Sequence, residues 1–166
     1  MQALAANLVP AGGAGEWSHG VFVLKLEPSE LTRTVQRLKT EFGFDIFLDV
    51  TAIDWLGRPE AAAGRFEVVH HFYSTQNKAR VRLKTRVPES EPMVDSLTAW
   101  YGSAAYMERE CHDMYGIRFD GNPDLRPILL YEGFVGHPLR KDYPINRRQK
   151  LARPTENLLT DDPEWA

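Results

Sequence analysis

The chain has 166 residues, 43% of them apolar and 26% charged, a composition typical of one folded domain and unlike that of a disordered chain. Its formal net charge of −3 disfavours a nucleic-acid partner, and its single cysteine, Cys111, can neither form a disulfide within the chain nor hold an iron–sulfur cluster by itself. No apolar run approaches the roughly 20 residues that cross a bilayer, so we expect a soluble cytoplasmic chain that meets a membrane only indirectly.

The first part of the chain begins loosely and then shows a strand and a helix. Residues 1–18 are expected to form a flexible N-terminus. Residues 21–26 (VFVLKL) predict a short strand. Apolar residues at three- and four-residue steps across 31–42 predict a helix, with Ser29 as its N-cap and Gly43 at its end.

Three further strands are predicted from alternating patterns. Residues 44–52 alternate so that one side carries Ile46, Leu48, Val50 and Ala52. Residues 65–74 and 79–87 are joined by a short polar stretch and predict an antiparallel hairpin at the outside of the sheet. Its second strand has an apolar face and a wet, basic face.

Two helices are predicted next, over residues 91–100 and over 104–115, the second closing at Gly116. The order of elements indicates an α+β fold for residues 19–119. We expect a two-layer arrangement, a mixed or antiparallel sheet with helices on one face.

The last segment, residues 120–166, has a different character. It holds six of the eleven prolines, which disfavour long helices and central strands, yet it keeps many apolar residues. Apolar side chains on an extended segment need another surface to cover them. We therefore predict an extended, proline-rich C-terminal arm that docks on a partner. Its basic stretch, residues 137–150, is more consistent with an acidic protein groove than with nucleic acid.

The densest polar cluster lies on the helix predicted over 104–115. Helical spacing pairs Glu108 with His112 and Arg109 with Asp113, which indicates an ion-paired helix face. The alternative is an independent metalloenzyme with Glu108, His112 and Asp113 as ligands, although zinc needs at least three protein ligands in a recognisable arrangement. His70 and His71 are adjacent in a strand, so their rings point to opposite faces and cannot chelate one ion together.

Several ordered motifs resemble one family. They are residues 108–117 (ERECHDMYGI), 122–126 (NPDLR) and 136–144 (GHPLRKDYP), with upstream support from 49–54 (DVTAID) and 66–74 (FEVVHHFYS). Together they are similar to the C subunit of NADH–quinone oxidoreductase, the 30-kDa subunit family of respiratory complex I.

The resemblance implies a non-catalytic structural subunit of the peripheral arm of that complex, which passes electrons from NADH through FMN and iron–sulfur clusters to quinone and translocates protons. The chain itself would hold no cofactor, metal or catalytic residue. FMN and the clusters would belong to partner subunits. The implied partners are chiefly the quinone-site D subunit, with the iron–sulfur B and I subunits, at the cytoplasmic face of the bacterial inner membrane. An equivalent subunit of a related membrane-bound hydrogenase or ferredoxin-using complex is the alternative.

On this hypothesis the partner interface is formed by the polar helix face and the arm. Charge-assisted contacts are expected from the basic residues, and burial by partners is expected for the apolar ones. For His137, a role as a plain turn residue is left open beside a role at a partner. The predicted interface residues are Glu108, Arg109, Glu110, Asp113, Asp124, Leu125, Arg126, Leu129, Leu130, His137, Leu139, Arg140, Lys141 and Tyr143.

Overall fold

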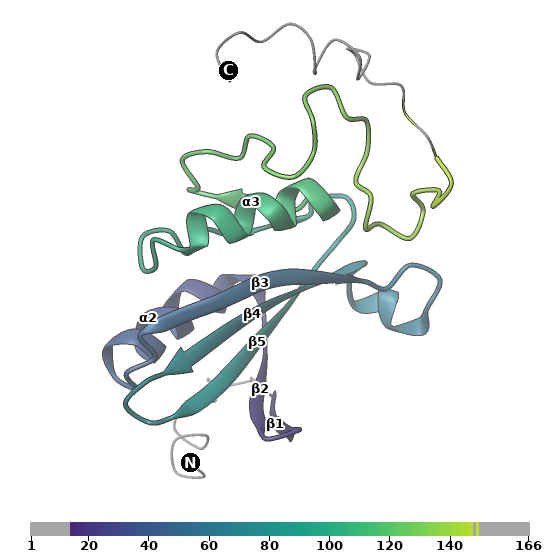
Figure 1. The fold of residues 1–166 in the computed structure, drawn as a ribbon. Helices are drawn as coiled ribbons and strands as arrows, with labels where there is room; N and C mark the ends of the chain where they lie inside the picture. The colour runs from purple at the N-terminus through teal and green to yellow at the C-terminus, as the bar shows by residue number, and fades with distance from the viewer. Residues whose placement is uncertain (1–13, 148, 150–166) are drawn as a thin grey trace, which may run out of the picture.

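A computed structural model of the chain describes residues 14–147 and 149 (Figure 1). Residues 1–13, 148 and 150–166 lie outside the described residues, and so do most of the predicted flexible N-terminus and the end of the predicted arm.

A five-stranded mixed sheet forms the centre of the fold. Its strands are β1 (Ala14–Ser18), β2 (Val21–Leu26), β3 (Ile46–Asp54), β4 (Phe66–Ser74) and β5 (Ala79–Val87), in the order β1-β2-β5-β4-β3. The β2–β5 pair is parallel and the other three pairs are antiparallel. The α+β prediction with a mixed sheet is confirmed.

Two helices, α2 (Leu31–Thr40) and α3 (Ala104–Tyr115), pack on one face of the sheet, and two short 3-10 turns, η1 (Pro28–Glu30) and η2 (Pro59–Ala63), lie in its loops. Both helices bury side chains in the same core cluster as the inward-facing strand residues. The other face carries the basic residues of β5, which remain partly exposed, as the alternation predicts. Members of the core cluster include Leu24, Leu31, Leu38, Val50, Phe72, Leu83, Ala104 and Cys111.

The hairpin and the first helix are confirmed with differences in detail. Strands β4 and β5 do form an antiparallel hairpin, but β5 is the central strand of the sheet because β2 pairs with its other side in parallel. Helix α2 starts after the 3-10 turn η1, so Ser29 lies inside that turn and is not the N-cap. Local spacing could not reveal either the long-range β2–β5 pairing or the extra turn.

The part of the predicted flexible N-terminus that the structure describes is a strand. Residues 14–18 form the edge strand β1, which turns back at Gly20 and pairs with β2 along its length. Trp17 contacts Phe22 with ring centroids 5.4 Å apart. An aromatic cross-strand contact of this kind stabilises a short edge strand that has little pattern of its own.

Strand β3 departs from simple alternation. A bulge between Phe47 and Asp49 shifts the register, so Phe47 turns into the core while Ile46 and Leu48 face outward. The prediction that Ile46 and Leu48 share a side with Val50 and Ala52 is wrong, because a bulge places two residues opposite one and reverses which side faces inward.

The helix predicted over 91–100 is absent from the structure. Its first part is the short strand β6 (Met93–Asp95), which pairs in parallel with β7 (Arg118–Asp120). The apolar residues at helical spacing, Val94 and Leu97, are buried all the same. A three-residue strand and a turn can place them inward as well as a helix can, and the non-local pairing decides between the two.

Candidate functional site: the anchored arm

The segment after β7 forms an extended arm. Its described residues, 121–147 and 149, contain neither helix nor strand, as predicted. In Figure 1 the arm runs in green to yellow over α3 and then past the end of the sheet. Hydrogen bonds along its course fix it to the domain at two places, described below as the helix anchor and the sheet anchor.

The helix anchor lies at the C-terminal turn of α3, whose bounds and closing residue Gly116 agree with the prediction. The last carbonyls of a helix have no partner within it. Here the arm supplies their donors. His137 Nδ1–H donates to the Asp113 carbonyl (2.9 Å), the Leu139 N–H to the Met114 carbonyl (3.1 Å), and Arg140 Nε–H to the Tyr115 carbonyl (2.6 Å).

Gly116 makes this close approach possible. Its φ of +70° is a left-handed conformation that glycine adopts without strain. A Cβ atom at this position would overlap the side chains of His137 and Arg140. The arm thus caps α3 through a gap that a side chain would close.

The carboxylate of Asp113 extends the helix anchor to an earlier part of the arm. Asp113 is buried, and its Oδ2 accepts the backbone N–H groups of Ile128 (2.7 Å) and Leu129 (2.9 Å), with Leu130 N at 3.5 Å. A carboxylate that accepts successive backbone N–H groups fixes the local path of a chain that has no secondary structure.

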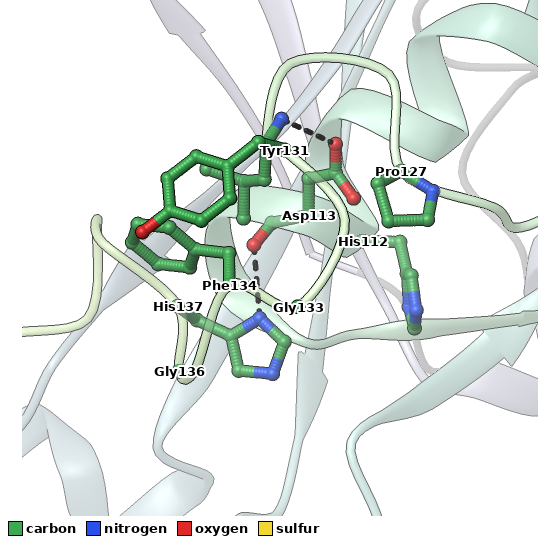
Figure 2. Close-up of a pocket in the computed structure, with 9 residues that line it drawn as sticks. His112, Asp113, Pro127, Tyr131, Gly133, Phe134, Gly136 and His137 are labelled. Carbon is green, nitrogen blue, oxygen red and sulfur yellow. Dashed lines mark hydrogen bonds between the residues drawn. The ribbon is translucent and has the colours of Figure 1, made fainter. Parts of the chain in front are cut away.

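A small cavity lies between α3 and the arm. It has a volume of about 130 Å³, and Figure 2 shows Asp113 above His137 on one side with Tyr131 and Phe134 on the other. The rings of Tyr131 and Phe134 contact one another, and Phe134 stacks on Tyr143. The cavity is lined by His112, Asp113, Pro127, Leu130, Tyr131, Gly133, Phe134, Gly136 and His137.

The sheet anchor lies where β3 ends and β4 begins. Arg65, only 5% exposed, donates through Nη2 to Asp54 Oδ2 (2.8 Å) and to Asp142 Oδ1 of the arm (2.7 Å). The Lys141 N–H donates to Asp54 Oδ2 (2.9 Å). Glu89, on the loop after β5, also pairs with the Arg65 guanidinium (2.5 Å).

The charges of the sheet anchor hold one another ionised. Burial alone would raise the pKa of Asp54, but hydrogen bonds from Arg65 and from the Lys141 and Leu56 N–H groups lower it to about 2. The Asp54 and Asp142 carboxylates raise the pKa of Arg65. Arg65 in turn lowers the pKa of Asp142. The arm therefore supplies part of the charge that balances a buried guanidinium.

Glu108 and Arg109 do not form the ion-paired helix face predicted for them. Glu108 is fully buried and accepts the Leu97 N–H (2.7 Å), the Ser96 hydroxyl (2.7 Å) and the Asn122 amide (2.8 Å). Arg109 donates through Nε to the Arg126 carbonyl (2.9 Å). The prediction is wrong because local helical spacing does not include the loops that pack against the helix.

The three ligands of the metalloenzyme alternative bind different segments of the chain. Glu108 binds the loop after β6, Asp113 binds the arm, and His112 Nδ1–H donates to the Ile117 carbonyl (2.9 Å). Within residues 14–147 and 149, no three His, Cys, Asp or Glu side chains are grouped so as to hold a metal ion.

Cys111 is buried, and the histidine pair lies as the sequence predicts. Cys111 is buried, and burial raises the pKa of its thiol, which opposes formation of a reactive thiolate. His70 is fully buried while His71 is half-buried, so the two rings face opposite sides of β4.

The predicted interface residues differ in how much of each remains exposed to a partner. Glu108, Asp113, His137 and Arg140 make bonds within the chain that position the arm. The more exposed group comprises Glu110, Arg126, Leu129, Leu139 and Lys141, and Leu125 is partly buried against the core. Arg126 pairs with Asp124 (Nη2–Oδ2 2.8 Å), and Leu130 and Tyr143 line or adjoin the cavity. Contact of these residues with partner subunits stays a prediction.

Sequence reasoning missed the sheet anchor altogether. Asp54 and Arg65 stand at facing ends of two strands joined by a loop, which is a weak signal for an ion pair. The return of Lys141 and Asp142 to this pair spans 87 and 77 residues of sequence, and no local pattern reveals it.

The fold and site together define an α+β domain with a proline-rich arm fixed to its surface. A model of the family described as respiratory-chain NADH dehydrogenase, 30 Kd subunit, matches residues 24–149. The C subunit of NADH-quinone oxidoreductase from Trichlorobacter lovleyi is 44% identical over 126 residues, which are 76% of each chain. The relative named as the C 2 subunit of the same enzyme in Rhizobium meliloti is 42% identical over 147 residues, covering 86% of this chain and 78% of the relative.

Two solved structures have a fold similar to that of this chain. The trypsin-resistant fragment (1-134) of Nqo5 matches with a TM-score of 0.65 at 28% identity, over 75% of this chain and 95% of that one. A chain of the membrane-bound sulfane sulfur reductase, an archaeal respiratory membrane complex, matches with a TM-score of 0.72 at 23% identity over 87% and 86%, which shows the fold alone.

The chain belongs to the 30 kDa subunit family of the respiratory-chain NADH dehydrogenase, the family that includes the C subunit of complex I. The resemblance noted in the motifs is confirmed. None of the helices in the described part of the chain combines the length and the apolar character needed to cross a membrane.

Proposed function

We propose that this chain is a structural subunit of the peripheral arm of NADH–quinone oxidoreductase, which holds neighbouring subunits together through its own C-terminal arm. The complex transfers electrons from NADH through FMN and iron–sulfur clusters to quinone and translocates protons. This chain contributes to that activity by assembly and performs no catalytic step. Its partners are chiefly the quinone-site D subunit, with the iron–sulfur B and I subunits beside it, at the cytoplasmic face of the bacterial inner membrane.

One observation carries the proposal beyond family membership. The arm is tied to its own domain by polar bonds, yet it leaves large apolar side chains uncovered. Leu129 is 60% exposed, Val135 59% and Leu139 53%, and Ile145 is fully exposed. Uncovered apolar side chains gathered on one segment are typical of a surface that another protein buries.

The relatives favour complex I over a related hydrogenase or ferredoxin-using complex, since three relatives at 42 to 44% identity are named as a C subunit of NADH-quinone oxidoreductase. The similarity in fold to the sulfane sulfur reductase does not distinguish complex I from a related hydrogenase or ferredoxin-using complex.

The test is co-purification of the full-length chain with the D, B and I subunits of the same organism. Leu129→Asp/Leu139→Asp should lower the yield of the co-purified quinone-site subunit at least about tenfold, because a carboxylate would be buried without a partner. Leu129→Met/Leu139→Met keeps the surface apolar and should retain normal yield. Undiminished co-purification of the quinone-site subunit with the aspartate variant would contradict the proposal.

The absence of a cofactor in this chain has a test of its own. The purified chain should contain no stoichiometric iron, zinc or flavin by metal analysis and visible absorption. Activity of the reconstituted complex should depend on the chain only through assembly. Stoichiometric metal or flavin in the isolated chain would overturn this part of the proposal.

A further inference from the structure

The arm combines two features that an unfolded tail would not have. Between residues 124 and 143 its backbone is bound repeatedly to buried or half-buried groups of the domain. Over the same stretch Leu129, Val135 and Leu139 each leave more than half of the residue exposed to solvent. The first feature fixes the path of the segment, and the second leaves an apolar surface that a partner could contact.

The bonds to the helix anchor form a continuous set. Asp113 alone receives the N–H groups of Ile128 and Leu129 at its carboxylate and the ring N–H of His137 at its carbonyl. Both ends of the loop 128–137 therefore converge on one residue of α3. The loop is closed by these polar bonds rather than by collapse onto the core, because the cavity of about 130 Å³ stays open beneath it.

The bonds to the sheet anchor fix the far end. Asp142 and the Lys141 N–H bind Arg65 and Asp54, and Arg65 is nearly inaccessible to solvent. The Arg65 and Arg140 guanidiniums both lie over the ring of Phe66, at 4.9 and 5.0 Å from its centroid. Removing the arm would leave the Arg65 guanidinium with fewer carboxylates, which is unfavourable for a buried charge.

We infer that residues 124–143 are a preformed docking element. This segment folds on its own domain before any neighbouring subunit binds, with the helix anchor and the sheet anchor as its supports, and it presents Leu129, Val135 and Leu139 to an apolar groove on a neighbouring subunit. Asp113 acts here as a positioning residue. The inference deepens the proposed function and rests on it for the identity of the partner as another subunit of the complex.

Preformation changes how the chain binds its neighbour. A segment that is ordered only on binding loses conformational entropy at that moment, and this weakens its affinity for a given contact area. A segment already held in its bound shape does not incur that loss. By ordering the segment in advance, the two anchors therefore raise the affinity of the chain for its neighbour.

Amide hydrogen exchange of the isolated full-length chain tests preformation without any partner. The N–H groups of Ile128, Leu129, Leu139 and Lys141 should exchange at least about tenfold more slowly than in an unstructured peptide. Asp113→Ala should return Ile128 and Leu129 to the unstructured rate while the β4–β5 amides keep theirs. Asp142→Asn, at a half-exposed site, should speed exchange at Lys141 and leave Ile128 protected.

Two outcomes separate this inference from the proposed function. If those four amides exchange at unstructured rates in the isolated chain while the quinone-site subunit still co-purifies, the segment is not preformed and the proposed function stands. If the amides are protected but Leu129→Asp/Leu139→Asp binds the quinone-site subunit normally, the segment is preformed but is not the docking surface, and the proposed function is contradicted. Loss of protection at the β4–β5 amides in Asp113→Ala would mean that this variant is unfolded. In that case Asp142→Asn, which leaves the core intact, provides the test of the sheet anchor.

Discussion

At the scale of single residues, Glu108 holds three separate segments of the chain. Its buried carboxylate accepts bonds from Ser96, Leu97 and Asn122. Burial raises the pKa of Glu108, and the bonds from these three groups oppose that rise. Glu108 therefore stabilises the fold mainly by accepting hydrogen bonds from donors that would otherwise be buried without a partner.

Replacing Glu108 by Ala should lower the free energy of unfolding by about 2–4 kcal/mol, because the Leu97 N–H loses its partner and a cavity opens. Urea denaturation of the isolated chain measures this. Glu110→Ala removes an exposed carboxylate two residues along the same helix and should change stability by less than about 0.5 kcal/mol. Equal effects of the two substitutions would show that the bonds to Glu108 do not stabilise the fold.

His70 predicts a pH dependence of stability. It is fully buried, and neither ring nitrogen bonds any residue that the structure describes. Burial, with the nearby charge of His71, lowers the pKa of His70 to about 3 from its ordinary 6.5. Between these two values the unfolded chain binds one proton more than the folded chain, so stability falls as the pH falls through this window.

The expected contribution of His70 is a loss of about 1.4 kcal/mol between pH 7.5 and 5.5. His70→Leu replaces the imidazole with an apolar side chain of similar size that does not titrate, and should remove that part of the pH dependence. Urea denaturation at the two pH values measures it, with His19→Gln at an exposed site as the control. An unchanged pH dependence in His70→Leu would assign the effect to other groups.

At the scale of elements, the C-terminal turn of α3 joins the core to the arm, and Gly116 is its critical point. Gly116→Ala places a Cβ against His137 and Arg140 and adds left-handed strain. Gly133→Ala, at a φ of +86° with no atom within 4 Å of the new Cβ, adds the strain alone. We expect Gly116→Ala to cost about 1 kcal/mol more than Gly133→Ala in urea denaturation and to speed exchange of the Leu139 amide. Equal costs would mean that the arm does not need the gap at Gly116.

The sequence predicts those elements whose signals are local. The bounds of helix α3 and its closing glycine are indicated by neighbouring residues of the sequence. The β4–β5 hairpin is indicated by two alternating strands joined by a polar turn. The motif GHPLRKDYP could be recognised as part of a family, and its proline content correctly indicates an arm without regular structure.

Elements and anchors that depend on distant residues could not be predicted in this way. Met93–Asp95 becomes a strand because Arg118–Asp120 lies beside it, and β3 changes its inward side at a bulge that the pairing with β4 creates. The site follows the same rule. Asp113 binds residues 15 and 16 positions along the chain, and Asp54 binds one 87 positions along. Such contacts depend on the topology of the sheet rather than on the pattern of any one segment.

At the scale of the whole molecule, the two anchors set where the chain opens to proteases. Cleavage requires local unfolding of the segment around the cut. The bond after Arg126 precedes proline, which trypsin does not cleave, and Arg140 and Lys141 lie within the helix and sheet anchors. Arg147 is exposed beyond both anchors, where its guanidinium lies over Tyr143, 5.5 Å from the ring centroid.

Limited trypsin digestion of the isolated chain should therefore cut first at Arg147 or further along, and mass spectrometry should find a stable fragment that retains Lys141. Asp142→Asn weakens the sheet anchor and should speed cleavage at Arg140 and Lys141 at least about tenfold relative to the natural chain, since the local opening becomes less costly. First cleavage of the natural chain at Arg140 or Lys141 would mean that the domain ends near β7 and that the arm becomes ordered only on its partners.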